Sequence, residues 1–406
     1  MRILHFSKYA DKGGAALAAL SSVRSQRAMG ADALLHVGRH PTTDPYVSGP
    51  RGRIADARAY RDFALERMPF RLLRTDPFDT RSLGMSGIAC SAIARRAKAD
   101  IVVLHNIDGL LDLTDLPRFP CPVVWRTHDM WAMCGTEHYV ADTTPYRPGG
   151  DRSRLDPLSR WTFRRKARLY SKVPSLTVCA PSRWLGDEMA TSELLGDRPS
   201  VTIPNGIDTG LFRPHDRLAA RAALALPADA PLILFGSAGG LMDARKGFDL
   251  LGQALHHAQD RLVSMGARLV TFGGGRVPDF GIATVDMGRI VDRQRSSLLY
   301  AAADIVMVPS RLENLSLTVL EALACGTPVV AFRIGGMPDM IDHGHNGWLV
   351  DPFSIEGLGD TVLTGLDASR SGEDMRRSCR EVAVSRFDRQ IEAARFLELC
   401  SRVAHQ

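Results

Sequence analysis

The sequence predicts an α/β fold with two Rossmann-like, doubly wound parallel sheets that face a cleft. Three observations favour this class. The chain has 406 residues, which is too many for one ordinary hydrophobic core. Short apolar runs recur without polar alternation, as in strands that are covered on both faces. Helical patterns separate these runs, and repeated strand–helix–strand order is typical of parallel sheets.

The elements can be followed in chain order. The first residues, MRILHF, enter an apolar run at once and are expected to form a strand. Helical apolar spacing is found in 184–195, 247–262, 292–303 and 387–406. The further expected strands are 101–105, 122–128, 175–182, 231–239, 267–275, 303–310 and 327–332.

A break in this pattern marks the domain boundary. Residues 203–214 carry the turn pair Asn205-Gly206 and show no clear period. We therefore expect one domain over 1–205, a second over 206–385, and a helix over 386–406. Ligands of open α/β sheets bind at the carboxyl ends of the strands, so a site is expected there.

Composition predicts a soluble globular protein. The chain is 45% hydrophobic and 24% charged. No run approaches the roughly 18–20 apolar residues of a membrane span, and the N-terminus has no signal-peptide pattern. Seven cysteines show no CxxC spacing, so neither a metal site nor a disulfide framework is predicted. These features favour a cytoplasmic location.

Positive charge is concentrated in the first half of the chain. Residues 1–200 carry 30 Lys and Arg against 21 Asp and Glu, whereas residues 201–406 carry 21 against 24. A basic half is compatible with an anionic membrane surface or nucleic acid, and equally with an ordinary Arg-rich surface. No zinc-finger, RNP-like or KH pattern is present, so we expect no nucleic-acid partner.

Glycines follow several expected strands. Gly14 opens a helix after the first strand, Gly239 ends the run 231–239, and Gly274 follows another strand. A tight glycine turn lets a ligand approach the backbone and a helix N-terminus, although most such turns have no ligand. Neither glycine run fits GxGxxG with an acid about 20 residues later, so a nicotinamide dinucleotide site is poorly supported.

Two acids eight residues apart are more informative. Glu313 lies in the loop after the expected strand 303–310, and Glu321 lies in a helix that begins near Ser316. The amides of Leu315 and Ser316 could bind a diphosphate at the helix start. Glu321, one to two turns below, could accept hydrogen bonds from a ribose diol, and Glu313 could reach a sugar. The alternative is a helix with one exposed glutamate.

These residues stand within a longer family motif. The stretch RLENLSLTVLEALACGTPVV (311–330) resembles the E-x7-E signature of retaining family-4 glycosyltransferases, which have the GT-B fold. The likeness continues in 335–352, 246–251 and 180–212. The segment THDMWAMCGTEHY (127–139) is similar to transferases that build bacterial polysaccharides of the colanic-acid type. The resemblance covers nearly the whole chain.

The resemblance implies roles for charged and polar residues. Lys246 matches the lysine that contacts the donor diphosphate, and a positive charge there stabilises the departing group. In many members an arginine precedes this lysine by five residues, but Leu241 stands there, so Arg245 could substitute or simply face water. His128, at a strand end, matches a histidine near the donor sugar. Asn314 joins the donor-binding candidates from the motif loop.

The acceptor side is less defined. His138 and Tyr139 either pack or contact the acceptor. Relatives often carry cysteines after this pair, whereas residues 140–157 have none. The basic stretches 51–74 and 160–172 could lie on an anionic inner membrane or be ordinary surface helices. In the family, the acceptor is commonly a polyprenyl-linked saccharide.

The resemblance predicts a retaining glycosyltransferase acting in polysaccharide synthesis. Its N-domain would bind the acceptor, its C-domain would bind the nucleotide-diphosphate sugar, and its last helix would cross back to the N-domain. No cofactor and no metal are expected, because GT-B enzymes stabilise the diphosphate with helix ends and cations. The alternatives are a GT-B sugar-nucleotide epimerase and a catalytically silent binding scaffold of this fold.

Overall fold

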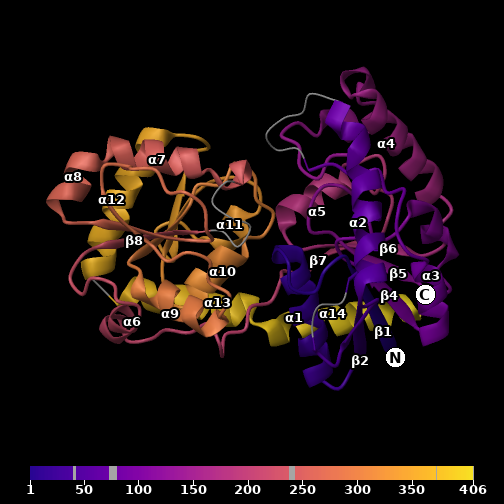
Figure 1. The fold of residues 1–406 in the computed structure, drawn as a ribbon, viewed down its shortest axis with the longest axis horizontal. Coiled ribbons are helices and arrows are strands. Elements are labelled where there is room, and N and C mark those ends of the chain that lie inside the picture. Colours follow the sequence, from indigo (N-terminus) through magenta and orange to yellow (C-terminus); the bar gives the residue numbers. More distant parts are fainter. Residues whose placement is uncertain (40–42, 73–79, 237–242, 372, 406) are drawn as a thin grey trace. The chain divides into compact units, whose positions relative to one another are not determined.

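The computed structural model describes residues 1–39, 43–72, 80–236, 243–371 and 373–405. The predicted pair of doubly wound parallel sheets is confirmed, with helices on both faces of each sheet (Figure 1). The chain divides into two compact units. The candidate Gly239 and the neighbouring Leu241 lie outside the described residues.

The first unit comprises Met1–Gly206 and Gln390–Gln406. Within its described residues, seven parallel strands pair in the order β3-β2-β1-β4-β5-β6-β7. The strand order reverses direction between β1 and β4, and this switch point is where open sheets bind ligands. The strands are β1 Arg2–Ser7, β2 Asp32–Val37, β3 Val47–Ser48, β4 Ile101–Leu104, β5 Val123–Arg126, β6 Leu176–Ala180 and β7 Ser200–Thr202.

The helices of the first unit connect these strands and cover the sheet. The α-helices are α1 Gly14–Ala28, α2 Arg53–Arg67, α3 Cys90–Ala97, α4 Pro157–Tyr170, α5 Arg183–Ala190 and α14 Arg389–Ala404. Short 3₁₀ turns are η1 Met68–Leu72, η2 Leu113–Arg118, η3 Thr144–Tyr146 and η4 Arg152–Arg154.

The second unit comprises Ile207–Arg389. Its described residues form a six-stranded parallel sheet in the order β10-β9-β8-β11-β12-β13, with a switch point between β8 and β11. The strands are β8 Leu232–Gly236, β9 Arg268–Phe272, β10 Ala283–Asp286, β11 Ile305–Val308, β12 Val329–Phe332 and β13 Gly347–Val350. The helices are α6 Arg217–Ala223, η5 Ala244–Lys246, α7 Phe248–His257, α8 Gln259–Ser264, α9 Arg293–Ala302, α10 Leu317–Ala324, α11 Met337–Met340, α12 Ile355–Ser371 and α13 Asp374–Phe387.

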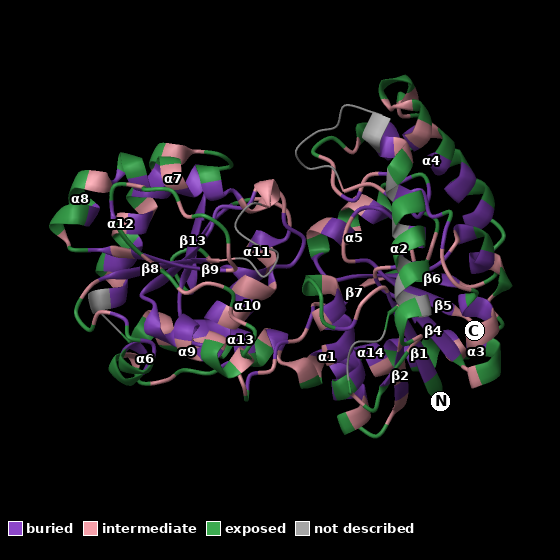
Figure 2. Ribbon diagram, viewed as in Figure 1, coloured by how far each residue is buried: buried purple, intermediate pink, exposed green. Residues whose placement is uncertain are grey.

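Burial explains why the strand sequences lack polar alternation. The inner strands of both sheets are covered on both faces, and every residue of β4, β5, β11 and β12 is buried (Figure 2). The edge strand β10 is mostly exposed, and its sequence ATVD contains two polar residues. The apolar runs therefore encode position within the sheet as well as strand structure.

The last helix completes the core of the first unit. Phe396, Leu399, Cys400 and Val403 of α14 are buried in one apolar cluster with residues of β1, β2 and α1. The chain passes between the units twice, and the two passing segments lie side by side. Ile207 N–H donates to Phe387 O at 2.8 Å, and Arg389 N–H donates to Ile207 O at 3.0 Å.

Two expected helices differ from those observed. The pattern over 247–262 forms two helices, α7 and α8, which meet at Ala258. The pattern over 184–195 ends at Ala190. There the Thr191 hydroxyl donates to the carbonyls of Asp187 and Glu188, and Glu193 N–H bonds to Tyr146 O outside the helix. Side-chain and tertiary hydrogen bonds thus replace the helical ones.

Candidate functional site

Two candidate residues of the second unit form an ion pair at its switch point. Lys246 follows β8 in the chain, and Glu313 follows β11, the neighbour of β8 in the sheet. Lys246 Nζ lies 2.5 Å from Glu313 Oε2, and the two side chains are 22% and 11% exposed. Ser310 Oγ lies 3.5 Å from the same carboxylate oxygen. The strand order thus brings together two charges that are 67 residues apart.

Arg311 fastens the Glu313 loop to the turn that carries Lys246. Its guanidinium donates to both carboxylate oxygens of Asp249 on α7, at 2.7 and 2.5 Å. It also donates to the carbonyl of Ala244 at 2.9 Å. The hydrogen bonds from Arg311 lower the pKa of the Asp249 carboxyl below its ordinary value. Arg311 is not among the residues that the sequence singles out, although it opens the motif that holds Glu313.

Two glycines allow the backbone to come close at this ion pair. Gly247 follows Lys246 with φ +68°, and a Cβ there would lie 1.9 Å from Pro309 O. Gly335 has φ +48°, and a Cβ there would lie 2.1 Å from Glu313 O. Any other residue at either position would push the loops of Lys246 and Glu313 apart.

Glu321 lies in the second turn of α10, where other side chains hold its carboxylate. The hydroxyl of Tyr300 donates to Oε2 at 2.9 Å, and Arg293 Nη2 lies 3.5 Å from Oε1. Burial raises the pKa of Glu321, and Arg293 and Tyr300 oppose that rise. The side chain is 15% exposed. The Tyr300 and Arg293 contacts thus stabilise the buried carboxylate of Glu321. The predicted hydrogen bonds from a ribose would add to these two contacts.

The start of α10 is buried and capped. Ser316 is the N-cap residue, and its hydroxyl accepts from Val319 N–H at 3.5 Å. Asn314, Leu315 and Ser316 are all buried, between 3% and 7% exposed. Leu315 lies one residue before the cap, so the helix-terminal amides begin at Ser316.

The remaining donor-side candidates are more scattered. Arg245 Nη2 donates to Asp243 Oδ2 at 2.7 Å, so a neighbouring acid engages its charge. Gly274 has φ +77° in the turn after β9, and no atom of the described residues lies within 4 Å of an added Cβ. Gly14 is the exposed first residue of α1 in the first unit.

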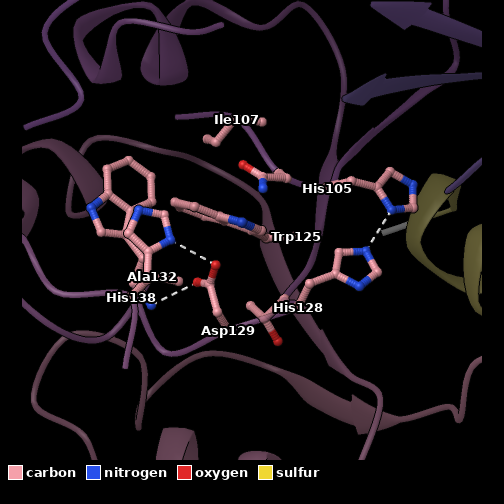
Figure 3. Close-up of a pocket in the computed structure, with 10 residues that line it drawn as sticks. His105, Ile107, Trp125, His128, Asp129, Ala132 and His138 are labelled. Carbon is pink, nitrogen blue, oxygen red and sulfur yellow. Dashed lines mark hydrogen bonds and ion pairs between the residues drawn. The ribbon is translucent and has the colours of Figure 1, made fainter. Parts of the chain in front are cut away.

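Three histidines form a row at the switch point of the first sheet. His5 lies on β1, His105 follows β4 and His128 follows β5, so they come from three neighbouring strands. His5 Nδ1 lies 2.9 Å from His105 Nε2. His105 Nδ1 lies 2.9 Å from His128 Nε2, and Figure 3 shows this second contact. Ring centroids are 5.2 Å apart in both pairs.

The histidine row is neutral at pH 7. Burial lowers the pKa of His128 to about 3, and the positive charge of Arg126 acts in the same direction. Burial also lowers the pKa of His5 to about 3 and holds the pKa of His105 well below its ordinary value. The sequence predicts only His128. The signal for the other two is a histidine within or directly after an apolar run, which acquires meaning only once the strand order is known.

His138 is held from both sides of its ring. Nδ1 lies 2.7 Å from Asp129 Oδ2, as Figure 3 shows. Nε2 lies 2.9 Å from Ser82 Oγ, and the ring stacks on Trp131. Burial acts to raise the pKa of Asp129, but His138 and the Trp131 amide outweigh it and leave that pKa lowered. These contacts bury His138 and fix the orientation of its ring. Tyr139, next in the chain, is half-buried.

A buried lysine fixes the loop between Asp129 and His138. Lys166 on α4 is fully buried, and its ammonium donates to the carbonyls of Trp131, Cys134 and Gly135. Burial lowers the pKa of Lys166 to about 7. All three ammonium hydrogens have acceptors, so this lysine serves the loop and not a membrane surface.

Residues of the loop that follows Tyr139, among them Val140 and Tyr146, line a pocket in the first unit. It has a volume of about 360 Å³. Its lining combines cations, acids and one aromatic ring, including Arg81, Arg154, Glu137, Asp156 and Tyr146. Such a mixed lining suits a polyhydroxylated molecule.

The first unit also carries exposed apolar and basic side chains. On α2 and the adjoining turn, Tyr60, Leu65 and Met68 are 75%, 51% and 61% exposed, and on α4 Trp161 is 45% exposed. In the part of the chain that the structure describes, no helix combines the length and apolar character needed to cross a membrane.

Two family models match the chain. Residues 12–211 match the model described as Glycosyltransferase Family 4, and residues 232–367 match the model described as Glycosyl transferases group 1. The two matches do not overlap, and together they take in most of both sheets.

Curated relatives match over part of their length. The D-inositol 3-phosphate glycosyltransferase of Saccharomonospora viridis is 37% identical over 177 residues, which cover 40% of this chain and 40% of that protein. The D-inositol 3-phosphate glycosyltransferase 2 of Catenulispora acidiphila is 32% identical over 231 residues, covering 49% and 53%. The chain thus spans about half or less of the length of these relatives.

Solved structures match over nearly the whole chain. Sucrose-phosphate synthase from Thermosynechococcus elongatus has a TM-score of 0.67 at 18% identity, covering 99% of this chain and 98% of that one. Anabaena HepE in complex with UDP and glucose gives 0.67 at 17%, covering 99% and 100%. WaaG, a glycosyltransferase involved in lipopolysaccharide biosynthesis, gives 0.66 at 16%, covering 99% of each chain. At these identities the likeness is one of fold.

Proposed function

Because the chain belongs to the family-4, group 1 glycosyltransferases and has the GT-B fold, we propose that it transfers a sugar from a nucleotide-diphosphate sugar to an acceptor hydroxyl, with retention at the anomeric carbon. The observation that carries this proposal is the contact between Lys246 and Glu313 at the switch point of the second sheet. Neither charge is needed for the core, since both side chains remain partly exposed.

Lys246 would stabilise the departing diphosphate. As the glycosidic bond breaks, negative charge grows on the leaving group, and a fixed cation stabilises that state more than the ground state. An ammonium has three hydrogens, so Lys246 can keep its bond to Glu313 while it donates to a phosphate oxygen. Glu313 would orient the Lys246 ammonium through this bond. Its carboxylate would also accept a hydrogen bond from a sugar hydroxyl.

The other donor contacts follow from the same unit. Glu321 would accept from the ribose diol, and the capped start of α10 at Ser316 would face the diphosphate. Asn314, Gly274 and Arg245 are further candidates at neighbouring strand ends. Solved neighbours are described in complex with UDP or UDP-glucose, which favours a uridine nucleotide.

The donor is identified by a stability screen. UDP, GDP and ADP sugars are each added to the protein, and the melting temperature is recorded. A ligand at about 100 times its Kd stabilises the folded protein by about 2.7 kcal/mol. The parent nucleosides serve as controls. If no nucleotide sugar raises the melting temperature above that measured with its parent nucleoside, the donor assignment fails.

We propose a saccharide or lipid-linked saccharide as the acceptor, as in bacterial polysaccharide synthesis. The support is the likeness of residues 127–139 to transferases of that type and the 360 Å³ pocket lined in part by Glu137 and Val140. Within this unit, His128 would contact the reacting sugar, and Tyr139 would contact the acceptor.

A second acceptor class is an inositol phosphate. The curated relatives carry that name, although the matched stretches cover only 40% to 53% of their length. The two acceptors are separated by incubating the donor with D-inositol 3-phosphate or with a polyprenyl-diphosphate saccharide. Formation of a glycosylated product with only one of the two acceptors identifies the acceptor class. A sugar isomer formed when the donor is incubated without acceptor would identify an epimerase instead.

We also propose peripheral contact with an anionic membrane through the first unit. The support is the exposed set Tyr60, Leu65, Met68 and Trp161, which lies among exposed arginines such as Arg164. Co-sedimentation with anionic and with neutral vesicles tests it. Equal recovery in the supernatant with both vesicles contradicts the proposal.

Catalysis without a metal is part of the same proposal. Lys246 and the start of α10 would supply the positive potential that a divalent ion supplies elsewhere. Activity is therefore expected to survive dialysis against a chelator. A loss that Mg²⁺ or Mn²⁺ restores would contradict this.

A further inference from the structure

The histidine row continues into the protein as a longer chain of hydrogen bonds. Beyond His5, the chain passes to Gln26 and Ser22 on α1 and ends at Glu392 on α14. His5 Nε2 lies 3.1 Å from Gln26 Oε1, and Gln26 Nε2 lies 2.9 Å from Ser22 Oγ. Ser22 Oγ lies 2.9 Å from Glu392 Oε1. Each of these side chains is at most 5% exposed.

The far end of the chain has a defined charge. Glu392 Oε1 lies 3.4 Å from Nη2 of Arg126, whose side chain is 1% exposed. A buried guanidinium is always protonated and requires a negative partner. Burial raises the pKa of Glu392, and Arg126 and Ser22 oppose that rise. The contact with the Arg126 guanidinium favours the carboxylate form of Glu392, which can only accept hydrogen bonds.

The carboxylate determines the direction of the next two bonds. Ser22 must give its single hydrogen to Glu392, so its oxygen is left to accept from Gln26. The amide nitrogen of Gln26 therefore faces Ser22, and its carbonyl oxygen faces His5. A carbonyl oxygen only accepts, so His5 carries its proton on Nε2.

The same direction passes along the three rings. A neutral imidazole has one donor and one acceptor nitrogen. His5, protonated on Nε2, accepts at Nδ1 from Nε2–H of His105. His105 in turn accepts at Nδ1 from Nε2–H of His128.

We propose that Glu392 is a positioning residue that acts through this chain of five hydrogen bonds to fix the tautomer of His128, with the proton on Nε2 and an unprotonated Nδ1. His128 is then a neutral hydrogen-bond acceptor at Nδ1 and cannot donate there. Resting on the proposed function, this assigns His128 to accept from a sugar hydroxyl, and it excludes a donating role at that nitrogen.

The reverse direction would carry a clear cost. If His128 held its proton on Nδ1, each bond in the row would invert, and Ser22 would have to give its hydrogen to Gln26. Glu392 would then lose the hydrogen bond from Ser22, and a buried carboxylate that loses a donor is destabilised. The polarity of the chain is therefore set at its charged end.

The tautomer is measured directly by ¹⁵N NMR on the ligand-free full-length protein with labelled histidine. Long-range ¹H–¹⁵N spectra separate the Nε2–H from the Nδ1–H form, and His128→Gln identifies the His128 signals by their disappearance. We expect the Nε2–H pattern for His128. A protonated Nδ1 overturns the proposal, whatever the donor and acceptor prove to be, because the readout needs no turnover.

A matched pair of variants on α1 tests the role of Glu392. Ser22→Ala cuts the chain between the carboxylate and Gln26. Ser25→Ala, one turn away, removes a buried hydroxyl that has no hydrogen-bond partner among the described residues. We expect Ser22→Ala to shift His128 from the pure Nε2–H pattern toward a mixture, and Ser25→Ala to leave it unchanged. If both variants keep the pure pattern, the carboxylate does not set the tautomer and the proposal fails. If both shift it, the effect is one of packing, and the proposal fails equally.

Discussion

The two candidate clusters occupy the same place in two similar sheets, but they differ in charge. In the first unit, the histidine row at the β1/β4 switch point is neutral and nearly enclosed. In the second unit, Lys246 and Glu313 at the β8/β11 switch point form an ion pair whose side chains are 22% and 11% exposed. The switch point of a parallel sheet can thus hold either neutral or charged side chains. The residues in the loops that follow its strands determine which kind is present.

The difference indicates a division of labour. The neutral cluster is oriented by a long internal network and can only present hydrogen-bonding groups. The charged cluster can respond to charge that develops on a ligand. Perturbing either cluster should therefore affect different quantities: stability and orientation in the first unit, rate and affinity in the second.

The largest effect is expected from Arg126→Met in the first unit. This change leaves Glu392 buried without its cation, which should lower the free energy of unfolding by about 3–5 kcal/mol. Denaturant unfolding followed by the fluorescence of Trp125 and Trp131 measures it. Arg164→Met, at an exposed position of α4, is the control and should stay within about 0.5 kcal/mol.

Adding Glu392→Leu to Arg126→Met sharpens the result. Removing both partners should recover much of the lost stability, since apolar replacements of buried ion pairs are often tolerated. A single Arg126→Met variant as stable as the Arg164→Met control would show that the buried pair does not hold the first unit together.

The next effect concerns the charged cluster. Lys246→Ala should lower kcat by about 10²–10³-fold, or about 2.7–4 kcal/mol, because the interaction is stronger in the transition state. Lys246→Arg should recover only part of the rate, since the guanidinium is wider and differently shaped. Arg245→Ala, whose guanidinium is bonded to Asp243, should cost less. Steady-state kinetics of folded variants measure this, and wild-type kcat for Lys246→Ala would reduce the lysine to surface charge.

A smaller effect is expected at Glu321. Glu321→Ala should weaken nucleotide binding by about 1.5–3 kcal/mol, the value of a hydrogen bond to a charged group. Calorimetry with the cognate nucleoside diphosphate measures it. Tyr300→Phe removes the protein donor to the same carboxylate while leaving the acid, so it separates loss of orientation from loss of the acceptor. Unchanged affinity in folded Glu321→Ala would leave Glu321 with a structural role only.

A further effect is the acid sensitivity of the histidine row. The folded pKa values of His5 and His128 are about 3, below the ordinary value of 6.5, so the unfolded chain binds more protons below pH 6.5. Stability should be complete above that pH and fall as the pH drops toward 3, by about 1.4 kcal/mol per pH unit for each histidine. Unfolding of the wild type and of His128→Gln between pH 7 and 5 measures it. Equal slopes for the two proteins would contradict a buried neutral His128.

The sequence predicts the fold well because the local composition of each strand segment indicates that the strand is buried. Runs such as IVVLH and ADIVMVPS need only their own composition to be recognised as covered strands. Lys246 and Glu313 are also predictable, because a family motif surrounds each of them. Their mutual contact depends on β8 and β11 being neighbours, which no local pattern shows.

The network in the first unit lies beyond local prediction. His5 and His105 are single polar residues in apolar surroundings, and Glu392 is one acid on an amphipathic helix almost 290 residues from His105. Residues 160–172 illustrate the same limit, since their charge predicts a basic surface. The helix phase turns Arg165 and Lys166 inward and leaves Trp161 and Arg164 outside.

The place of α14 has a consequence for how the protein is made. The strand β7 leaves the ribosome about 190 residues before Glu392, a delay of about 10–40 s at ordinary translation rates. During that interval the nascent first unit lacks Phe396 and Leu399 and leaves the face that they cover open. The second unit, whose residues are contiguous, is synthesised in full before the first can close. The first unit, although it is synthesised first, can therefore complete its core only after the second unit has been synthesised.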